Sequence, residues 1–167
     1  MQKESMSRYP DTSDAQTDLP LAREIYRAFL GELSAITDYL YDAIVIAPEI
    51  PALSALFRET ACTEMAHYEA LGTLLPHLGA SPALRVTLRQ LPIRLREDAR
   101  AHAPVLAEQM LKRAIEGENK TAALYATLAG KAADASVREL LSLLSEEEKG
   151  HAAASVYDLL AERPHRQ

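Results

Sequence analysis

Two copies of one short pattern contain the residues of this chain that could perform metal chemistry. The first copy has Glu32 with Tyr39 seven residues later, and then a Glu-x-x-His made by Glu64 and His67. The second copy repeats these residue types as Glu118, Tyr125, Glu148 and His151. Residues three apart are neighbours on a helix surface, so each Glu-x-x-His presents a carboxylate and an imidazole on one face. Four such carboxylates and two imidazoles, directed inward from four helices, can hold two metal ions.

The spacing within the two copies is nearly the same. In the first copy the lone Glu is residue 32 and the Glu of the Glu-x-x-His is residue 64. In the second copy the corresponding residues are 118 and 148. A single match would be weak, because Glu and His are common in helices. The repetition predicts one metal centre built from both copies.

The cost of burying a carboxylate supports this interpretation. Each predicted helix carries one Glu in the middle of its apolar stripe, with no Lys or Arg on the same stripe to pair it. Buried acids are usually paired or bound to metal, and two divalent cations would neutralise four carboxylates. Oxygen ligands suit iron, manganese or magnesium, and the imidazoles favour iron or manganese. The residues alone therefore predict two iron or two manganese ions; such a pair can bind both oxygens of O₂ or peroxide.

Neighbouring acids compete for the same roles. Glu147 lies four residues before His151 and is the nearest rival to Glu148, but the apolar stripe that includes Leu144 favours Glu148. Glu116 has a lysine four residues away on each side, which is typical of a solvated helix face.

The two tyrosines allow two interpretations. Tyr39 and Tyr125 lie on the same helix faces as Glu32 and Glu118, two turns further along. They could be core residues, or their hydroxyls could donate hydrogen bonds to ligand carboxylates. Face and spacing do not distinguish the two.

Composition limits the class of protein. The chain has 167 residues, 48% of them hydrophobic, with six Gly and no Trp, which favours one helical domain. The net charge of −6 provides no basic surface for nucleic acid or an anionic membrane. The single cysteine, Cys62, excludes an internal disulfide and any cysteine-based zinc or iron–sulfur site. No apolar run approaches the roughly 20 residues of a membrane span. We expect a soluble, cytoplasmic protein.

The elements that must position the acids follow from apolar periodicity. Steps of three and four predict four helices, over residues 21–47, 51–75, 104–132 and 135–162, with Asp18 and Asp134 as caps. Residues 80–103 predict a long crossover that contains some helix. The prediction is an all-α, up-down four-helix bundle over residues 19–162, with one long crossover between the second and third helices. Residues 1–18 are predicted to be a disordered tail, and residues 163–167 a C-terminal tail.

With these motifs, the chain resembles the ferritin-like superfamily, and most of all rubrerythrin-type proteins. The segments that carry the resemblance are ELSAITDYLY, EMAHYEALG and AIEGENKTAALYATLAGKAADASVRELLSLLSEEEKGH. It covers residues from about 20 to 162. The resemblance implies a ferritin-like bundle in which Glu64 and Glu148 bridge two metal ions. The implied metal ligands are Glu32, Glu64, His67, Glu118, Glu148 and His151.

The resemblance also implies an activity. Members of the family reduce peroxide or O₂ at a di-iron centre, so we expect a non-haem di-iron oxidoreductase that acts on hydrogen peroxide or O₂. Full rubrerythrins carry a rubredoxin module with paired Cys-x-x-Cys; this chain has only Cys62, so it would need an external electron donor protein. They also carry an extra carboxylate where this chain has Thr121, which argues against their redox-linked ligand exchange.

Several other functions remain open at this point. One is manganese catalase-like dismutation of peroxide, which needs no donor. Another is non-catalytic iron binding and oxidation for storage or delivery, and a third is a structural bundle with a relict site. An organic substrate also remains open, because ferritin-like sites serve hydroxylases as well. We expect a homo-oligomer, most simply a dimer.

Overall fold

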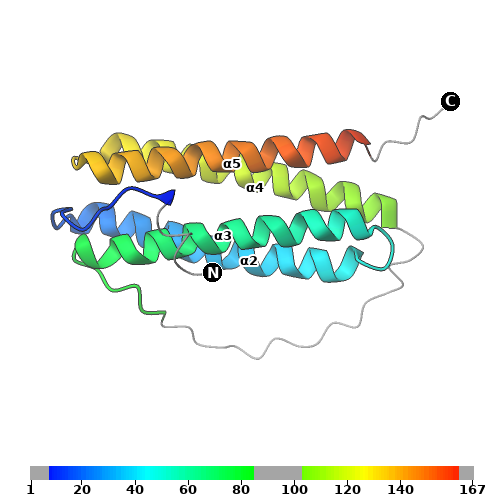
Figure 1. Cartoon of the computed structure of the whole chain (residues 1–167), viewed down its shortest axis with the longest axis horizontal. Coiled ribbons are helices and arrows are strands. Elements are labelled where there is room, and N and C mark those ends of the chain that lie inside the picture. Colours follow the sequence, from blue (N-terminus) through cyan, green and yellow to red (C-terminus); the bar gives the residue numbers. More distant parts are fainter. Residues whose placement is uncertain (1–7, 85–102, 162–167) are drawn as a thin grey trace.

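Four long helices make up the described part of the chain in this computed structural model, which describes residues 8–84 and 103–161. The helices, labelled as in Figure 1, are α2 Leu19–Ile46, α3 Pro51–His77, α4 Ala103–Lys131 and α5 Ala135–Ala161. No strand occurs within these described ranges. Each helix begins and ends within two residues of its predicted bounds. The all-α prediction is confirmed.

Aspartates cap two of the helices as their sequence context predicts. The Asp18 carboxylate accepts a hydrogen bond of 3.0 Å from the backbone N–H of Leu21. The Asp134 carboxylate accepts bonds of 2.9 and 3.1 Å from the backbone N–H groups of Ser136 and Val137. Each cap satisfies N–H groups that have no partner inside the helix. These contacts fix where α2 and α5 begin.

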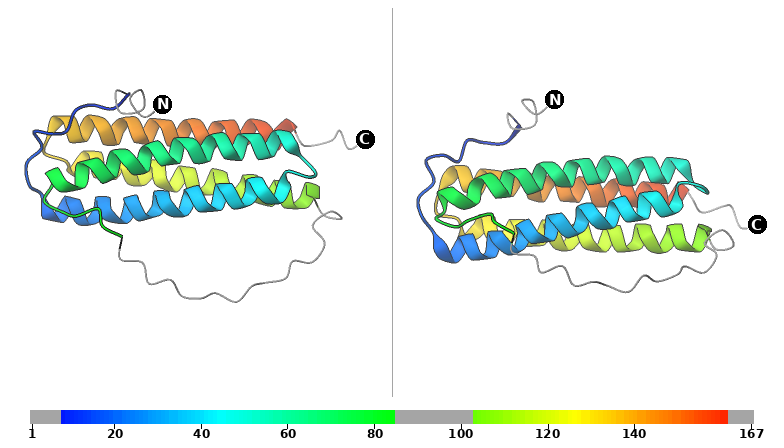
Figure 2. Two further views of the ribbon diagram at one scale, coloured as in Figure 1. Left: turned by 60° about the horizontal axis from the view of Figure 1, so that its bottom comes forward. Right: turned by 90° about the horizontal axis from the view of Figure 1, so that it is seen from below.

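The helices form two antiparallel pairs, α2 with α3 and α4 with α5, which lie alongside each other (Figures 1 and 2). α3 ends at the end of the bundle where α2 begins, whereas α4 begins at the opposite end. The connection between them therefore returns along the length of the bundle, and the up-down topology with one long crossover is confirmed. The helix predicted within this crossover falls largely on residues 85–102, which lie outside the described residues. Within the described chain, none of the helices has the length and apolar character needed to cross a lipid bilayer.

The apolar core is divided into two clusters by a polar layer. One cluster includes Phe29, Leu71 and Leu128, and the other includes Phe57 and Met110. On each helix, one buried glutamate lies at mid-length beside these apolar residues; the four are Glu32, Glu64, Glu118 and Glu148. The two clusters shield the glutamates from water along the bundle axis.

The N-terminal segment, residues 8–18, differs from the prediction. Tyr9 packs against the first apolar cluster, Thr12 is buried, and the backbone N–H of Asp18 donates a 3.2 Å hydrogen bond to the carbonyl of Leu78. The prediction of a disordered tail is wrong for residues 8–18, because a tyrosine and a capping aspartate anchor a stretch that is otherwise polar. Residues 1–7, and the predicted C-terminal tail over 163–167, lie outside the described residues.

Candidate metal centre

Six side chains from all four helices meet at the middle of the bundle. Their oxygen and nitrogen atoms form two groups, in each of which the possible ligand atoms all lie within 4.8 Å of one another. The first group is Glu32, Glu64, His67 and Glu148; the second is Glu64, Glu118, Glu148 and His151. The structure thus brings together all six residues that the sequence proposes as metal ligands, and Glu64 and Glu148 belong to both groups.

Helical spacing sets the geometry of each Glu-x-x-His. The Nδ1 atom of His67 lies 3.1 Å from Glu64 on its own helix and 3.0 Å from Glu148 on α5. The Nδ1 atom of His151 lies 3.4 Å from Glu148 on its own helix and 3.0 Å from Glu64 on α3. Each imidazole therefore directs the same nitrogen at the two shared carboxylates.

Several buried polar atoms of this centre lack hydrogen bonds. They are Oε1 of Glu64, both carboxylate oxygens of Glu148 and Nδ1 of His151, none of which has a hydrogen-bond partner among the described residues. Their charged neighbours lie at 3.0–3.4 Å without the geometry of a hydrogen bond. A buried polar atom without a hydrogen bond costs about 1–3 kcal/mol. Metal coordination would satisfy all of these atoms at once, and three carboxylates with one imidazole per group form a donor set that suits iron or manganese. The residues fit a two-metal centre.

Two buried tyrosines connect the halves of the centre. The hydroxyl of Tyr39 on α2 donates a hydrogen bond to Glu118 on α4, and that of Tyr125 on α4 donates one to Glu32 on α2. Both tyrosines also belong to the apolar clusters. Each therefore packs in the core and orients the glutamate of the other sequence copy. Spacing along one helix could not predict that each tyrosine bonds to the glutamate of the other copy.

The position of Glu147 does not follow from its spacing along the helix. Glu147 lies behind His67, with its Oε2 atom 2.9 Å from Nε2 of that imidazole. Its carboxylate also contacts Arg8 and Tyr9 of the N-terminal segment. A carboxylate behind a histidine fixes the ring and its tautomer. The only sequence signal was its place in the run Glu146–Glu148, directly before a proposed ligand.

The four central glutamates divide into two kinds by pKa. Burial, together with the neighbouring carboxylates, raises the pKa of Glu32 to about 9 and that of Glu118 to about 8. Burial alone would also raise the pKa values of Glu64 and Glu148, but the adjacent imidazoles outweigh it and lower both. Without metal, these directions favour a proton on Glu32 and Glu118 and negative charge on Glu64 and Glu148 at neutral pH.

The two imidazoles carry the matching positive charge. Burial alone would lower their pKa values, but the surrounding carboxylates raise the pKa of His67 well above its ordinary range and that of His151 to about 11. Two imidazolium groups thus balance the two ionised carboxylates in the metal-free protein. Metal ions would have to displace these protons, which is the usual coupling of metal binding to ligand pKa.

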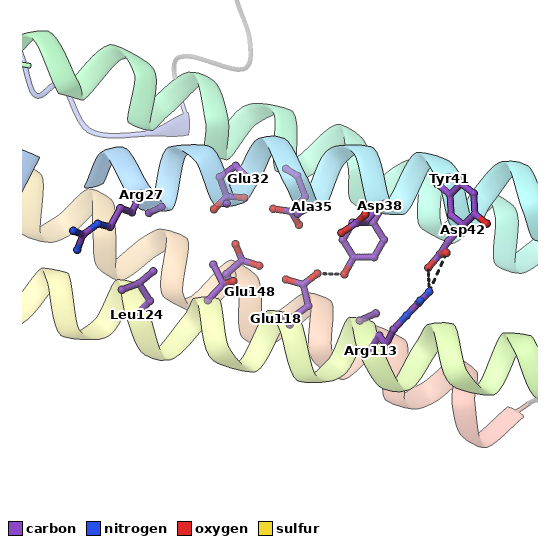
Figure 3. A pocket seen from close by; sticks show the side chains of 17 residues that line it. Arg27, Glu32, Ala35, Asp38, Tyr41, Asp42, Arg113, Glu118, Leu124 and Glu148 are labelled. Atoms are coloured by element: carbon purple, nitrogen blue, oxygen red, sulfur yellow. Dashed lines mark hydrogen bonds and ion pairs between the residues drawn. The ribbon is translucent and has the colours of Figure 1, made fainter. Parts of the chain in front are cut away.

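A cavity of about 410 Å³ opens onto the centre between α2 and α4 (Figure 3). It reaches Glu32, Glu118 and Glu148, and the glycines Gly31 and Gly117 line it. Neither histidine lines this cavity. Small molecules can therefore approach the carboxylates from the side opposite the imidazoles. The spacing of the acids alone does not reveal this cavity. The sequence does contain a signal for it, because Arg-Ala-x-x-Gly-Glu occurs twice, at 27–32 and 113–118, and both copies contribute to the lining.

Comparison with known proteins identifies the fold. Neither a protein-family model nor a curated protein matches the chain. Among solved structures, the bacterioferritin of Rhodobacter capsulatus is similar, with a TM-score of 0.68 and 20% sequence identity over 91% of this chain and 99% of that one. That structure is described as having a metal-free dinuclear site and a haem iron in a crystallographic special position. The likeness shows that this chain has the ferritin-like four-helix bundle fold.

Proposed function

We propose that this protein is a non-haem di-iron protein of the ferritin-like type. The observation that carries the proposal is the convergence of four carboxylates and two imidazoles in two overlapping groups, in which buried atoms of Glu64, Glu148 and His151 make no hydrogen bond. Glu64 and Glu148 would bridge the two ions. Glu32 and His67 would complete one ion's ligands, and Glu118 and His151 the other's. Four ionised carboxylates would neutralise two divalent cations.

The reaction we propose is the reduction of hydrogen peroxide or O₂. A reduced di-iron pair held by these residues would supply two electrons for cleavage of the O–O bond, so that one peroxide with two protons and two electrons gives two water molecules. The chain's own residues orient the site: Tyr39 and Tyr125 hold Glu118 and Glu32, and the cavity between α2 and α4 admits a small oxidant. These 167 residues contain one cysteine, Cys62, and we propose that an external donor protein supplies the electrons.

The rubrerythrin-type assignment rests on the sequence resemblance. Thr121 lines the cavity, and Glu118 lies one helical turn before it in the same lining. A threonine cannot replace a carboxylate as an anionic metal ligand. We therefore propose a fixed six-residue ligand set without redox-linked ligand exchange.

Peroxide turnover tests the reaction. Anaerobic protein loaded with Fe²⁺ should be oxidised once by added peroxide and then stop, and sustained consumption should require an added reductant. Sustained consumption with release of oxygen and no donor would instead indicate manganese catalase-like dismutation. If neither peroxide nor O₂ oxidises the loaded protein, the oxidoreductase function is refuted and only metal binding remains.

Iron oxidation for storage or delivery is the second candidate. It is favoured by the bundle's likeness to a bacterioferritin and by the six-residue ligand set. Excess Fe²⁺ in air distinguishes the two functions. Storage predicts continued uptake far beyond two ions per chain in a large assembly, whereas the oxidoreductase predicts uptake that stops at two ions in a small oligomer, most simply a dimer.

A further inference from the structure

The N-terminal segment, residues 8–18, reaches only one of the two histidines. The Tyr9 hydroxyl donates a 3.0 Å hydrogen bond to Oε2 of Glu147, and Arg8 lies 2.5 Å from the other oxygen of that carboxylate. The same Oε2 atom lies 2.9 Å from Nε2 of His67. A continuous path of polar contacts therefore runs from the segment to the imidazole, whose opposite nitrogen faces Glu64 and Glu148.

Tyr9 contributes more to this path than Arg8. The Arg8 side chain is 53% exposed, and exposed ion pairs stabilise little, typically about 0–1 kcal/mol. Tyr9 is half-buried against the first apolar cluster. Burial is the main cause that raises its pKa to about 12, so its hydroxyl remains a neutral hydrogen-bond donor at physiological pH. The orientation of Glu147 therefore depends mainly on the Tyr9 hydroxyl.

The segment is anchored independently of the metal centre. Its far end caps α2 through Asp18 and hydrogen-bonds to Leu78. Gly79 allows Thr17 to approach closely: a Cβ atom on this glycine would lie 2.9 Å from the Thr17 methyl carbon. Because both ends of the segment contact the bundle, Tyr9 has a fixed position over Glu147.

His151 differs from His67 in this respect. Thr63 occupies the position in α3 that Glu147 occupies in α5, directly before the Glu of the Glu-x-x-His. Its hydroxyl donates to the carbonyl of Glu59 on its own helix, at 3.4 Å. The described residues thus supply no equivalent carboxylate behind the His151 ring. The His151 side chain is 16% exposed, whereas that of His67 is fully buried.

We propose that Tyr9, acting through Glu147 on His67, makes the two metal positions unequal. The group with Glu32 and His67 holds its ion tightly, and the group with Glu118 and His151 holds the exchangeable ion. This inference rests on the proposed two-metal function. Tyr9 is a positioning residue: it contacts no ligand atom itself, and it stabilises the carboxylate that orients the ligand. Loss of such a partner typically weakens metal affinity 10–100-fold.

Calorimetric titration of the metal-free full chain with Mn²⁺, which does not oxidise in air during the experiment, tests this proposal. The wild-type protein should show two separate binding steps. Tyr9→Phe should weaken the tighter step about 10–100-fold and leave the weaker step unchanged. Glu147→Gln should reproduce this selective change.

Tyr26→Phe is the matched control. The Tyr26 hydroxyl also donates a 3.0 Å hydrogen bond, to the carbonyl of Ala83, and its ring packs against the same apolar cluster. This variant should alter neither binding step. If Tyr9 were merely structural, Tyr9→Phe would resemble the control in metal binding and differ only in melting temperature.

The outcomes separate this inference from the proposed function. Two equal steps in the wild type, or a Tyr9→Phe variant that changes neither step or both steps equally, would overturn the inference while the two-metal function stands. A wild-type chain that binds neither Mn²⁺ nor Fe²⁺ would overturn the two-metal function, and the inference with it.

Discussion

Two consecutive glutamates, Glu147 and Glu148, each contact a different ring nitrogen of His67. Glu148 lies 3.0 Å from Nδ1 of His67, on the side of the other central carboxylates, and Glu147 lies 2.9 Å from Nε2. The apolar stripe of α5 predicted the inward position of Glu148. It could not predict the partner of Glu147, because that contact depends on how α3 and α5 pack. Spacing along a helix determines the side of the helix on which a residue lies. The packing of the helices determines which residues of other helices it contacts.

This difference predicts opposite effects for the two neighbours. Glu148→Ala removes a carboxylate that both groups share, so it should lose at least one metal ion per chain. Glu147→Ala removes no ligand, so the protein should still bind both ions at saturating metal, with weaker affinity for one. Elemental analysis after desalting from saturating Fe²⁺ measures both. The reverse result would mean that Glu147, rather than Glu148, is the ligand.

The raised pKa values predict how the stability of the metal-free protein depends on pH. Glu32 and Glu118 have ordinary pKa values of 4.5 but about 9 and 8 in the fold, and that of His151 rises from 6.5 to about 11. At a pH between the ordinary and the folded pKa of each group, the folded state binds more protons than the unfolded state. The free energy of unfolding should therefore fall as pH rises from 6 to 9. Below about 4.5, the lowered pKa values of Glu64 and Glu148 reverse the slope. The melting temperature of metal-free protein should therefore be highest near pH 5, and a steady rise from pH 6 to 9 would contradict these protonation states.

At the scale of elements, the four helices were predictable and the N-terminal segment was not. Apolar steps of three and four, with Asp18 and Asp134 as caps, set each helix boundary within two residues. The segment over residues 8–18 has no period that reveals its position. It is held by single contacts, such as Tyr9 on Glu147 and Thr17 beside Gly79. Such contacts become visible only once the helices are packed.

The turn after α3 provides a test of this anchoring. Gly79 has φ +87° and lies against Thr17, so Gly79→Ala adds both backbone strain and a steric conflict. It should destabilise the protein by about 1–2 kcal/mol. Gly117→Ala is the matched control, because this mid-helix position has open space around it; it should stabilise by roughly 0.5–1 kcal/mol. Urea unfolding of the metal-free variants measures both changes, and equal effects of the two substitutions would argue against the described turn.

At the scale of the whole molecule, the metal centre joins two separately paired halves. α2 with α3 supplies Glu32, Glu64 and His67, and α4 with α5 supplies the other three donors. Each group of donors contains residues from both pairs. The two ions would therefore hold the pairs together, in addition to the cross-connections from Tyr39 and Tyr125.

Removal of metal should consequently lower the melting temperature. A ligand that binds only the folded state at 100 times its Kd stabilises by about 2.7 kcal/mol. For a chain of this size each kcal/mol corresponds to about 2–4 °C, so each ion should contribute roughly 5–10 °C. Differential scanning calorimetry before and after verified chelation, at pH 7, measures the shift. An unchanged melting curve would exclude a buried two-metal centre.

The metal content of the protein as isolated tests the central claim most directly. The two overlapping groups of buried donors predict about two iron ions per chain, or two manganese ions under the alternative. This ratio should be the same from one preparation to the next. Elemental analysis of the purified full chain, together with its protein concentration, gives this ratio. A ratio near two, retained through desalting, is the predicted result. A ratio near zero that does not rise after anaerobic incubation with Fe²⁺ or Mn²⁺ would contradict the claim.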